Sequence, residues 1–305
     1  MKDKLSEDSP SPKENVTLSV ILVNYNGKEY IEKCLDSIKE NISGIRSEII
    51  VVDNHSTDGS AGVLERNHPD ILFLRNHKNV GFSKANNQGL KASSGEYVLL
   101  INPDTLVCSN AIKKLLAEIQ NNPDIGGVGP ALLSGQDNFQ ISFGGKVNFF
   151  SEAVKKTFLN RLFKSQLKKN PKKRNVKWLS AACFMSSRDI LKKAGMFDER
   201  FFLYFEDIDL CMRIRKRGWR LVYLPKARIF HTGGASTNKK KLKSRFHYRK
   251  SQLYFYRKHS SALSFFLLRI FLCMNFIFIL FQGLFKRNRD FKDRLRFFRL
   301  LGKQG

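Results

Sequence analysis

The chain has 305 residues, of which 42% are hydrophobic and 27% charged, and its formal net charge is +27. This length allows one large or two ordinary domains with a real core. Residues 155–177, 238–260 and 286–303 together carry 25 of the 27 net positive charges. A nucleic-acid-binding protein usually spreads its basic face over the folded domain, whereas basic attachments on a near-neutral body suit an anionic membrane surface. We therefore expect a membrane-surface partner and no nucleic acid, with 155–177 either a solvated loop or a contact for acceptor or lipid.

The N-terminal stretch MKDKLSEDSPSPKEN is polar and contains no apolar segment of the kind found in signal peptides. It predicts a disordered leader over residues 1–15 and no secretion signal. The five cysteines are odd in number, scattered, and without CxxC spacing. They predict reduced core thiols of a cytosolic protein and not a disulfide or zinc framework.

The first half of the chain alternates apolar runs with helical periodicity. Strands are predicted at 18–24, 47–54, 71–76 and 96–104, and helices at 28–41, 58–67, 81–93 and 111–119. Continuous apolar strands that alternate with helices predict an α/β fold with a parallel sheet covered on both faces. After residue 130 we expect shorter strands, a helix over 206–216 ended by Gly218, and two strands at 220–224 and 227–232.

Residues 262–285 form the only long apolar tract, and basic segments flank it on both sides. Its 24 residues are enough to cross a bilayer, but Arg269 lies within it, and a charge at the centre of a span costs about 2.5–3.5 kcal/mol. Three alternatives stay open: an interfacial or re-entrant helix, a membrane span, or a buried helix of the fold. In the segment that follows, Phe291, Leu295 and Phe298 recur at i, i+4 and i+7, which predicts an amphipathic helix in the headgroup plane.

Polar residues follow three of the predicted strands, at 24–27 (NYNG), 53–60 (DNHSTDGS) and 102–105 (NPDT). Ligands of open parallel sheets bind at the carboxyl ends of strands, and no Gly-rich phosphate loop follows the first strand. Tyr25 could stack on a nucleobase, Asp53 could accept a hydrogen bond from a pyrimidine N3–H, and Asp104 could hold Mg²⁺ or Mn²⁺ beside a diphosphate. The alternatives are a core position for Tyr25 and turn-forming roles for Asp53 and Asp104.

The stretch FFLYFEDIDLCMR places Glu206, Asp207 and Asp209 directly behind an aromatic run. Acidic residues favour the first turn of a helix, so the three carboxylates could simply begin one. Asp209 and Arg213 are spaced as an intrahelical pair. An aromatic wall would raise the pKa of Asp207 toward the working pH of a general base. Asp207 is our candidate base, and Glu206 is the second candidate.

Four segments together resemble the family 2 glycosyltransferases, which are inverting enzymes of the GT-A fold. They are VILVNYNG, IIVVDNHSTDGS, NVGFSKANNQGL with the following GEYVLLINPDT, and FDERFFLYFEDIDLCMRIRKRGW. The NPDT and FEDIDLCMR forms are most similar to the rhamnosyltransferase-like branch. The resemblance implies a GT-A domain over 16–237, with a nucleotide-sugar-binding half (16–130) and an acceptor and catalytic half (131–237). Residues 238–305 would then form a basic, apolar membrane-associating region.

The resemblance also assigns roles to individual residues. The nucleotide-sugar would contact Asn24, Tyr25, Asn26, Asp53, Asn86, Asn102 and Asp104. Asp104 matches the last acid of the family's metal-binding DxD motif, His231 matches a further metal ligand of some relatives, and Asp207 matches the base. Asn102 stands where the first acid of DxD usually lies, which implies weaker or more water-mediated metal binding. His231 at a strand end could equally be a structural hydrogen-bonding residue.

The resulting expectation is a non-processive sugar transferase, because the QxxRW signature of the processive branch is absent. It would move one sugar, with a rhamnose-like deoxysugar favoured, from dTDP-rhamnose or a UDP-sugar to a hydroxyl of a lipid-linked or cell-surface glycan. Its place would be the cytoplasmic face of the plasma membrane, in polysaccharide or lipopolysaccharide biosynthesis. The alternatives are a sugar nucleotidyltransferase and a basic nucleic-acid-binding protein.

Overall fold

The computed structural model describes residues 16–134, 138–145, 147, 172–232 and 241–285. The predicted leader, most of the basic segment 155–177 and the predicted helix with Phe291, Leu295 and Phe298 lie outside the described residues. The first half holds β1 (Leu18–Asn24), α1 (Ile31–Ile42), β2 (Ser47–Asp53), α2 (Ser60–Asn67), β3 (Leu72–Arg75), α3 (Phe82–Ala92), β4 (Tyr97–Ile101), β5 (Thr105–Val107) and α4 (Ala111–Gln120). The second half holds β6 (Ile125–Leu133), β7 (Phe143–Gly144), β8 (Arg174–Val176), β9 (Trp178–Leu179), β10 (Cys183–Ser187), α7 (Arg188–Lys193), α8 (Glu206–Lys216), β11 (Arg220–His231), α10 (Lys241–His259) and α11 (Ala262–Phe285).

One large sheet organises the body, in the order β3-β2-β1-β4-β10-β6-β11-β5, with β8 paired to β11. The first four strands run parallel, as the alternation of strands and helices predicts. The sheet is mixed and not wholly parallel, because β10 runs antiparallel to both β4 and β6. The strand predicted at 96–104 ends at Ile101, and the chain turns through 102–104 into β5. This turn brings the NPDT residues to the sheet edge.

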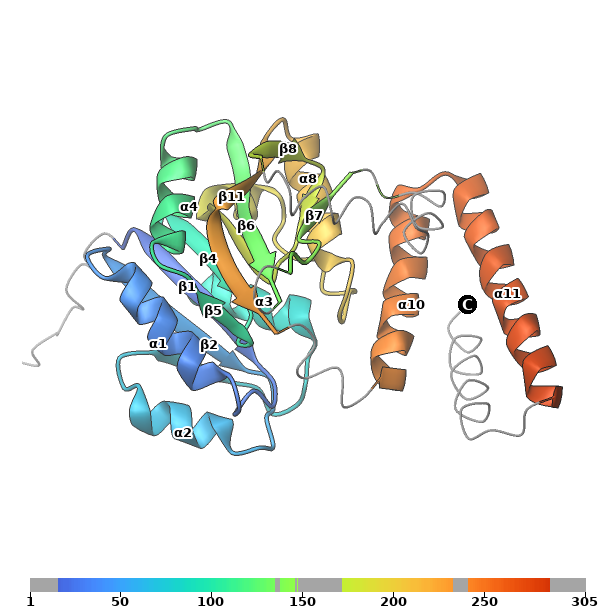
Figure 1. The fold of residues 1–305 in the computed structure, drawn as a ribbon, viewed down its shortest axis with the longest axis horizontal. Helices are drawn as coiled ribbons and strands as arrows, with labels where there is room; N and C mark the ends of the chain where they lie inside the picture. The colour runs from blue at the N-terminus through green and yellow to red at the C-terminus, as the bar shows by residue number, and fades with distance from the viewer. Residues whose placement is uncertain (1–15, 135–137, 146, 148–171, 233–240, 286–305) are drawn as a thin grey trace, which may run out of the picture.

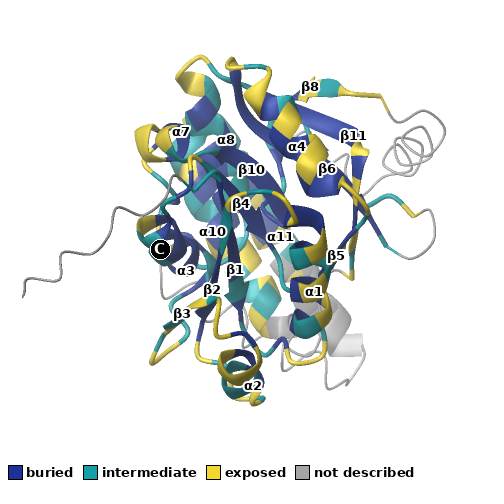
Figure 2. Cartoon of the chain, turned by 90° about the vertical axis from the view of Figure 1, so that its left-hand side faces the viewer, coloured by how far each residue is buried: buried dark blue, intermediate teal, exposed yellow. Residues whose placement is uncertain are grey.

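Helices cover both faces of the sheet, as expected (Figure 1). On one face α1 and α4 pack against the strands through a cluster that includes Leu35, Ile38 and Leu115. On the other face α3, α7 and α8 contribute Leu90, Leu191 and further apolar side chains to a second cluster. Figure 2 shows the central strands as buried and the outer helix faces as exposed. The apolar faces of these helices therefore pack against the sheet.

The two strands predicted at 220–224 and 227–232 form a single long strand, β11. Its register against β6 shifts between Leu224 and Arg228. Pro225 lies in this interval and has no N–H to donate, so it is found at irregular points of a sheet. The bulge leaves β11 continuous, and His231 at its end pairs opposite Thr105 of β5.

The cysteines are free thiols. Cys34, Cys183 and Cys211 are buried, as predicted for core thiols, whereas Cys108 is half-buried and Cys273 is exposed on α11. Burial raises the pKa of Cys34 to about 12, with hydrogen bonding to Thr105 opposing the shift. Because the raised pKa disfavours the reactive thiolate form, Cys34 is a packing group and not a nucleophile.

The C-terminal helix α10 lies beside the body, and α11 lies on the outer side of α10 (Figure 1). A third apolar cluster joins them to the chain before α8: Phe201 and Phe205 pack with Phe255 of α10 and with Leu268 and Leu272 of α11. The aromatic run of FFLYF therefore docks α10, a role that the sequence did not indicate. The boundary predicted at residue 237 falls between β11 and α10, yet α10 packs on residues 198–209, before that boundary. Among the described residues, no helix is long and apolar enough to span a bilayer.

Candidate active site

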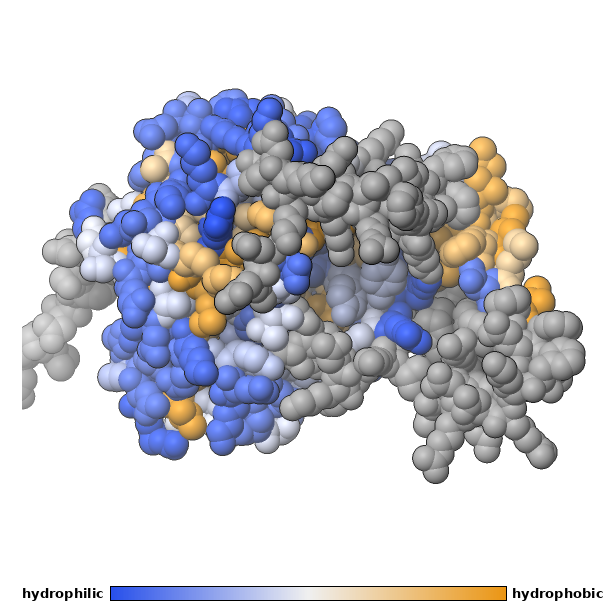
Figure 3. All heavy atoms as spheres, in the orientation of Figure 1, coloured by the Kyte–Doolittle hydropathy of each residue, from blue (hydrophilic) through white to orange (hydrophobic). Residues whose placement is uncertain are grey.

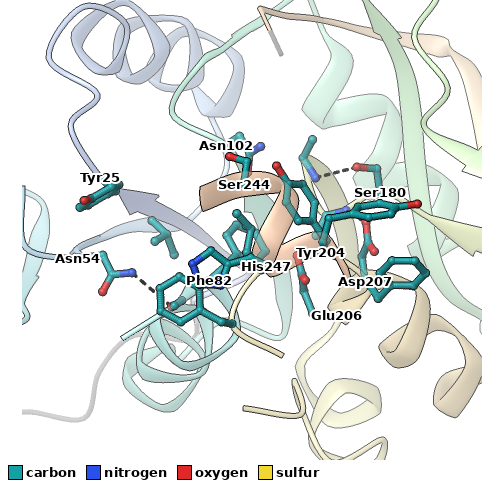
Figure 4. Close-up of a pocket in the computed structure, with 18 of the residues that line it drawn as sticks. Tyr25, Asn54, Phe82, Asn102, Ser180, Tyr204, Glu206, Asp207, Ser244 and His247 are labelled. Atoms are coloured by element: carbon teal, nitrogen blue, oxygen red, sulfur yellow. Dashed lines mark hydrogen bonds between the residues drawn. The ribbon is translucent and has the colours of Figure 1, made fainter. Parts of the chain in front are cut away.

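A cavity of about 540 Å³ lies where β1, β2 and β4 end. Tyr25 and Asn54 lie toward one end of it, and Tyr204 and Asp207 lie toward the other (Figure 4). Asn102, Asp104 and His231 also line it. The strand ends predicted to converge thus share one cavity with the predicted base. This position matches the general rule for ligands of open α/β sheets.

The side chains of Asn24 and Asp53 are used within the sheet edge. The register pairs the two residues across β1 and β2, and Asn24 Nδ2 donates to Asp53 Oδ1 at 3.0 Å and to Ser60 Oγ at 2.8 Å. Asp53 is 3% exposed, and its Oδ2 accepts from the Ser56 N–H at 3.0 Å. Asp53 therefore has the turn-forming contact weighed as its alternative role, and its donor contact stays a prediction. Its neighbour Asn54 lines the cavity instead.

Two further predicted contact residues also have structural partners. Asn26 Oδ1 accepts from the Thr57 N–H at 2.7 Å, and this bond links the end of β1 to the loop after β2. Asn86 is 2% exposed and donates to the Phe82 carbonyl at 2.9 Å, one turn back in α3. Neither residue is among those that line the cavity. Contact of Asn24, Asn26 or Asn86 with a nucleotide-sugar is untested and stays a prediction.

Asp104 and His231 meet because β5 and β11 pair antiparallel, with His231 opposite Thr105. His231 Nε2 lies 3.3 Å from Asp104 Oδ1, and both side chains are 12% exposed. Asn102 Nδ2 lies 3.4 Å from the same ring nitrogen. The three residues predicted near a metal are therefore together at one corner of the cavity.

Gln140 determines which ring nitrogen of His231 faces Asp104. Its Nε2 donates to the His231 carbonyl at 2.5 Å, so its Oε1, 2.9 Å from Nδ1, must accept the ring N–H. Nε2 is then the ring nitrogen that faces the Asp104 carboxylate, and in a neutral imidazole it carries the lone pair. Two electron-pair donors that face each other suit a bound cation, and a second group that orients the imidazole is typical of metal sites. Sequence analysis did not identify Gln140.

The described residues contain no group of three or more His, Cys, Asp or Glu that could hold a metal ion. Asp104 and His231 are two protein ligands, and the weaker metal binding expected from Asn102 stays a prediction. An oxygen and an imidazole nitrogen nevertheless suit Mn²⁺ or Mg²⁺ when phosphate and water complete the shell. The corner fits a cation shared with a diphosphate better than a permanently bound one.

The turn before α8 is strained. Tyr204 and Phe205 both have positive φ, 71° and 68°, a region that costs non-glycine residues about 1–2 kcal/mol each. The packing of Phe205, 4% exposed, against Phe255 and Tyr248 holds this geometry. This strained turn, held by the packing of Phe205, places the first residues of α8 at the cavity.

Glu206 and Asp207 begin α8 and line the cavity. Glu206 is 5% exposed, and its Oε2 has no hydrogen-bond partner. Burial, and next the charge of Asp207, raises the pKa of Glu206 well above its usual value. Asp207 is half-buried, and its two oxygens accept from the Ile208 N–H at 2.8 Å and the Ala181 N–H at 3.4 Å. Glu206, the second candidate, is thus the more deeply buried of the two carboxyls.

Asp209, the third acid, points away from the cavity. It is fully buried and pairs with Arg213 at i, i+4, as the spacing predicts, with 2.8 Å between Asp209 Oδ2 and Arg213 Nη2. Its Oδ1 also accepts from Lys258 Nζ and His259 Nε2, both at 2.6 Å. Asp209 thus fastens the end of α10 to the helix that begins with the two candidate catalytic acids.

The α10 wall of the cavity was missed by sequence analysis. Lys243, Ser244, His247 and Tyr248 of α10 line the cavity. His247 stacks on Phe202, with ring centroids 4.3 Å apart and planes at 17°. The clue was the aromatic run before the acids, which required a partner from elsewhere in the chain.

The similarity to known proteins agrees with this geometry. A sequence profile described as Glycosyl transferase family 2 matches residues 19–195. An N-acetylglucosaminyl-diphospho-decaprenol L-rhamnosyltransferase of Mycobacterium tuberculosis is 29% identical over 240 residues, which cover 73% of this chain and 78% of that relative.

Solved structures show the same fold at low sequence identity. GalNAc-T7 with UDP, GalNAc and Mn²⁺ superposes with a TM-score of 0.56 at 18% identity, over 72% of this chain and 44% of that one. A mannosyltransferase of Pyrobaculum calidifontis with GDP-Man and Mn²⁺ gives 0.54 at 20% identity, over 80% and 65%. The chain thus spans less than two thirds of either structure, and both likenesses identify the GT-A fold alone. The chain belongs to glycosyl transferase family 2, and the rhamnosyltransferase-like branch of that family is the one it resembles.

Proposed function

We propose that the chain is an inverting glycosyltransferase that moves one sugar from a dTDP- or UDP-sugar to a hydroxyl of a lipid-linked or cell-surface glycan. The observation that carries the proposal is the cavity that joins three groups: Tyr25 at one end, the Asp104–His231 corner, and Asp207 at the other end. A nucleobase, a diphosphate and an acceptor hydroxyl need these groups in that order. A rhamnose-like donor is favoured by the resemblance to the Mycobacterium tuberculosis rhamnosyltransferase.

Asp207 is the proposed general base. The acceptor hydroxyl gives its proton to Asp207 while its oxygen bonds the anomeric carbon from the face opposite the leaving group. The bond between that carbon and the diphosphate oxygen breaks, and the nucleoside diphosphate leaves with the electron pair. Burial raises the pKa of Glu206, which disfavours a second negative charge beside Asp207 and favours Asp207 as the proton acceptor.

Asp104 and His231 are the proposed holders of Mg²⁺ or Mn²⁺, with the Asn102 amide beside them. Gln140 accepts the Nδ1–H of His231 and so turns Nε2 toward Asp104, where it would bind the cation. A cation bound there would neutralise charge on the departing diphosphate. The Mn²⁺ in both superposed glycosyltransferase structures supports this assignment.

The proposed acceptor is a sugar carried on a lipid through a diphosphate. The name of the Mycobacterium tuberculosis relative describes such an acceptor for that protein. The apolar face of α11 supports the same substrate class, because Leu263, Phe266, Ile270, Met274 and Ile277 form an exposed stripe, here called the α11 stripe. Figure 3 shows apolar surface gathered at the side of the molecule where α11 lies.

We further propose peripheral attachment to an anionic bilayer, at the cytoplasmic face of the plasma membrane. Residues 241–259 of α10 contain seven Lys and Arg residues and no acids. Each cation near an anionic leaflet contributes about 1 kcal/mol of attraction, and an apolar helix face adds burial in the interface. Contact through the α11 stripe would hold the cavity close to a lipid-linked acceptor.

Incubation with labelled donors tests the function. Purified chain is mixed with dTDP-rhamnose, UDP-N-acetylglucosamine or GDP-mannose and with an N-acetylglucosaminyl-diphospho-lipid, and the lipid product is counted and its anomeric configuration assigned by NMR. We expect transfer from a dTDP- or UDP-sugar with inversion. A product of retained configuration, or donor binding without transfer to any lipid-linked sugar, would overturn the proposal.

A further inference from the structure

The α10 wall of the cavity has no role in the mechanism above, and it lies outside the residues that match the family profile, 19–195. Its side chains face a site whose other walls carry Asp104, Glu206 and Asp207. Lys243 is the only Lys or Arg among the described residues that line the cavity. A single cation opposite three acids indicates where an anionic group would be held.

His247, one helical turn after Lys243, is incompletely satisfied. Neither of its ring nitrogens has a hydrogen-bond partner, although both are buried. Burial, followed by the charges of Lys243 and Lys250, lowers the pKa of His247 to about 4. The neutral ring therefore offers one donor and one acceptor. A buried polar atom without a partner costs about 1–3 kcal/mol, and a bound ligand would supply the missing bond.

The α10 wall packs on the turn that leads into Asp207. Tyr248 packs on Phe205, with ring centroids 5.2 Å apart, and His247 stacks on Phe202. Both aromatic residues belong to the turn that leads into Asp207. Figure 4 shows His247 beside Phe82, between the Asn54 end and the Asp207 end of the cavity. A group bound to Lys243 and His247 would lie between the two ends, and we assign it to the acceptor, whose hydroxyl must reach Asp207.

The wall is held firmly in place by contacts at the far end of α10. Lys258 Nζ lies 2.7 Å from Asp198 Oδ2 and 2.6 Å from Asp209 Oδ1. Tyr254 donates to Asp198 at 2.9 Å, and Ser251 donates to the Leu203 carbonyl at 2.8 Å. These bonds place the second half of α10 against α8 and the chain before it, and the stack of His247 on Phe202 places the turn of α10 that carries His247.

We propose that α10 forms a phosphate-binding subsite for the acceptor, in which Lys243 pairs with a phosphate of a sugar-diphosphate acceptor and His247 hydrogen-bonds the same head group. The inference rests on the proposed function and deepens it by naming the part of the acceptor that is recognised. Lys243 supplies charge, His247 supplies a directed hydrogen bond, and Phe202 fixes the ring plane. The enzyme would select its acceptor by the phosphate next to the sugar and not by the lipid chain.

Calorimetry with a soluble probe tests this subsite. The full-length chain is titrated with N-acetylglucosamine diphosphate carried on a short alkyl chain, without vesicles, and separately with UDP and dTDP. Lys243→Met should weaken binding of the alkyl sugar diphosphate roughly 10- to 100-fold, the usual effect of losing a charge-assisted hydrogen bond, with nucleotide affinity unchanged. Arg245→Met is the matched control, because Arg245 is exposed on the same helix and does not line the cavity.

His247→Phe separates binding from folding, because phenylalanine keeps the stack on Phe202 and removes the two unpartnered nitrogens. We expect a higher midpoint of unfolding together with weaker probe binding. Unchanged probe affinity in both variants would overturn the subsite, and so would a wild-type chain that binds nucleotide but not the probe. Equal weakening of nucleotide binding by Lys243→Met would reassign Lys243 to the donor diphosphate. A wild-type chain that binds neither UDP nor dTDP would instead contradict the proposed function itself.

Discussion

Asp209→Ala should destabilise the fold more than any surface acid substitution, because Asp209 is 0% exposed and accepts hydrogen bonds from Lys258, Arg213 and His259. The distances are 2.6 Å to Lys258 Nζ, 2.6 Å to His259 Nε2 and 2.9 Å to Arg213 Nε. Removing one partner of a buried ion pair costs about 3–5 kcal/mol, since the remaining charges stay desolvated. We expect the free energy of unfolding to fall by about that amount.

Urea unfolding followed by circular dichroism measures the change, with Asp189→Ala as the control. Asp189 pairs with Lys193 on α7, but their side chains are 65% and 57% exposed, and exposed pairs contribute about 0–1 kcal/mol. If Asp209→Ala and Asp189→Ala change stability equally, the charge network does not hold α10 on α8.

The pH dependence of the same protein gives an independent check. Burial alone would raise the pKa of Asp209, but bonds from His259, Arg213 and Lys258 outweigh it and hold the pKa below its usual value. A lowered folded pKa means that this contribution is present above the unfolded pKa of about 3.9 and is lost as pH falls through the folded pKa. The stability difference between wild type and Asp209→Ala should therefore shrink in acid below about pH 4. A difference that stays constant to pH 2 would contradict the reasoning.

Three further predictions concern the site and the surface. Burial, and next the charge of Asp207, raises the pKa of Glu206. The contribution of Glu206 to stability is therefore present below the unfolded pKa of about 4.3 and is lost as pH rises through the folded pKa. Glu206→Gln should lack this loss in thermal melts across pH, and parallel curves for the two proteins would refute the assignment. Sugar transfer should fall in EDTA, and full activity in the chelator would exclude a metal requirement. Gln140→Leu should weaken Mn²⁺ binding, measured by calorimetry, roughly 10- to 100-fold. The full chain should pellet with anionic vesicles, and the double variant Phe266→Gln, Ile270→Gln in the α11 stripe should pellet less. Equal partition of wild type and double variant would exclude the stripe as the membrane contact.

Local patterns predicted much of the fold. The apolar runs gave β1 to β4 in order, and the helix predicted over 206–216 is α8, followed by Gly218 with φ of 99°. The intrahelical pair of Asp209 and Arg213 was also predictable, because i, i+4 spacing alone places such residues on one face. These features depend on residues close in sequence, for which periodicity and spacing carry the information.

Contacts between distant segments were not predictable in the same way. The aromatic run at 201–205 is explained by α10, some fifty residues later, and α10 carries polar and apolar residues around its whole circumference. A basic, aromatic helix has the same composition whether it docks on protein or on lipid. Asp53 was ambiguous for a related reason, because a carboxylate at a strand end serves a turn or a ligand equally well. Only the register of β1 with β2 shows its partners Asn24 and Ser56.

The role of Asp207 is tested most directly by measuring turnover and donor affinity together for Asp207→Asn. Asparagine keeps the shape and the hydrogen bonds to the Ile208 and Ala181 N–H groups but cannot take a proton. We predict that kcat for sugar transfer falls roughly 10²- to 10⁴-fold, the usual contribution of a general base, while UDP or dTDP binds by calorimetry as in wild type. Near-normal turnover of Asp207→Asn with intact nucleotide binding would contradict the account and move the base to another residue, first to Glu206.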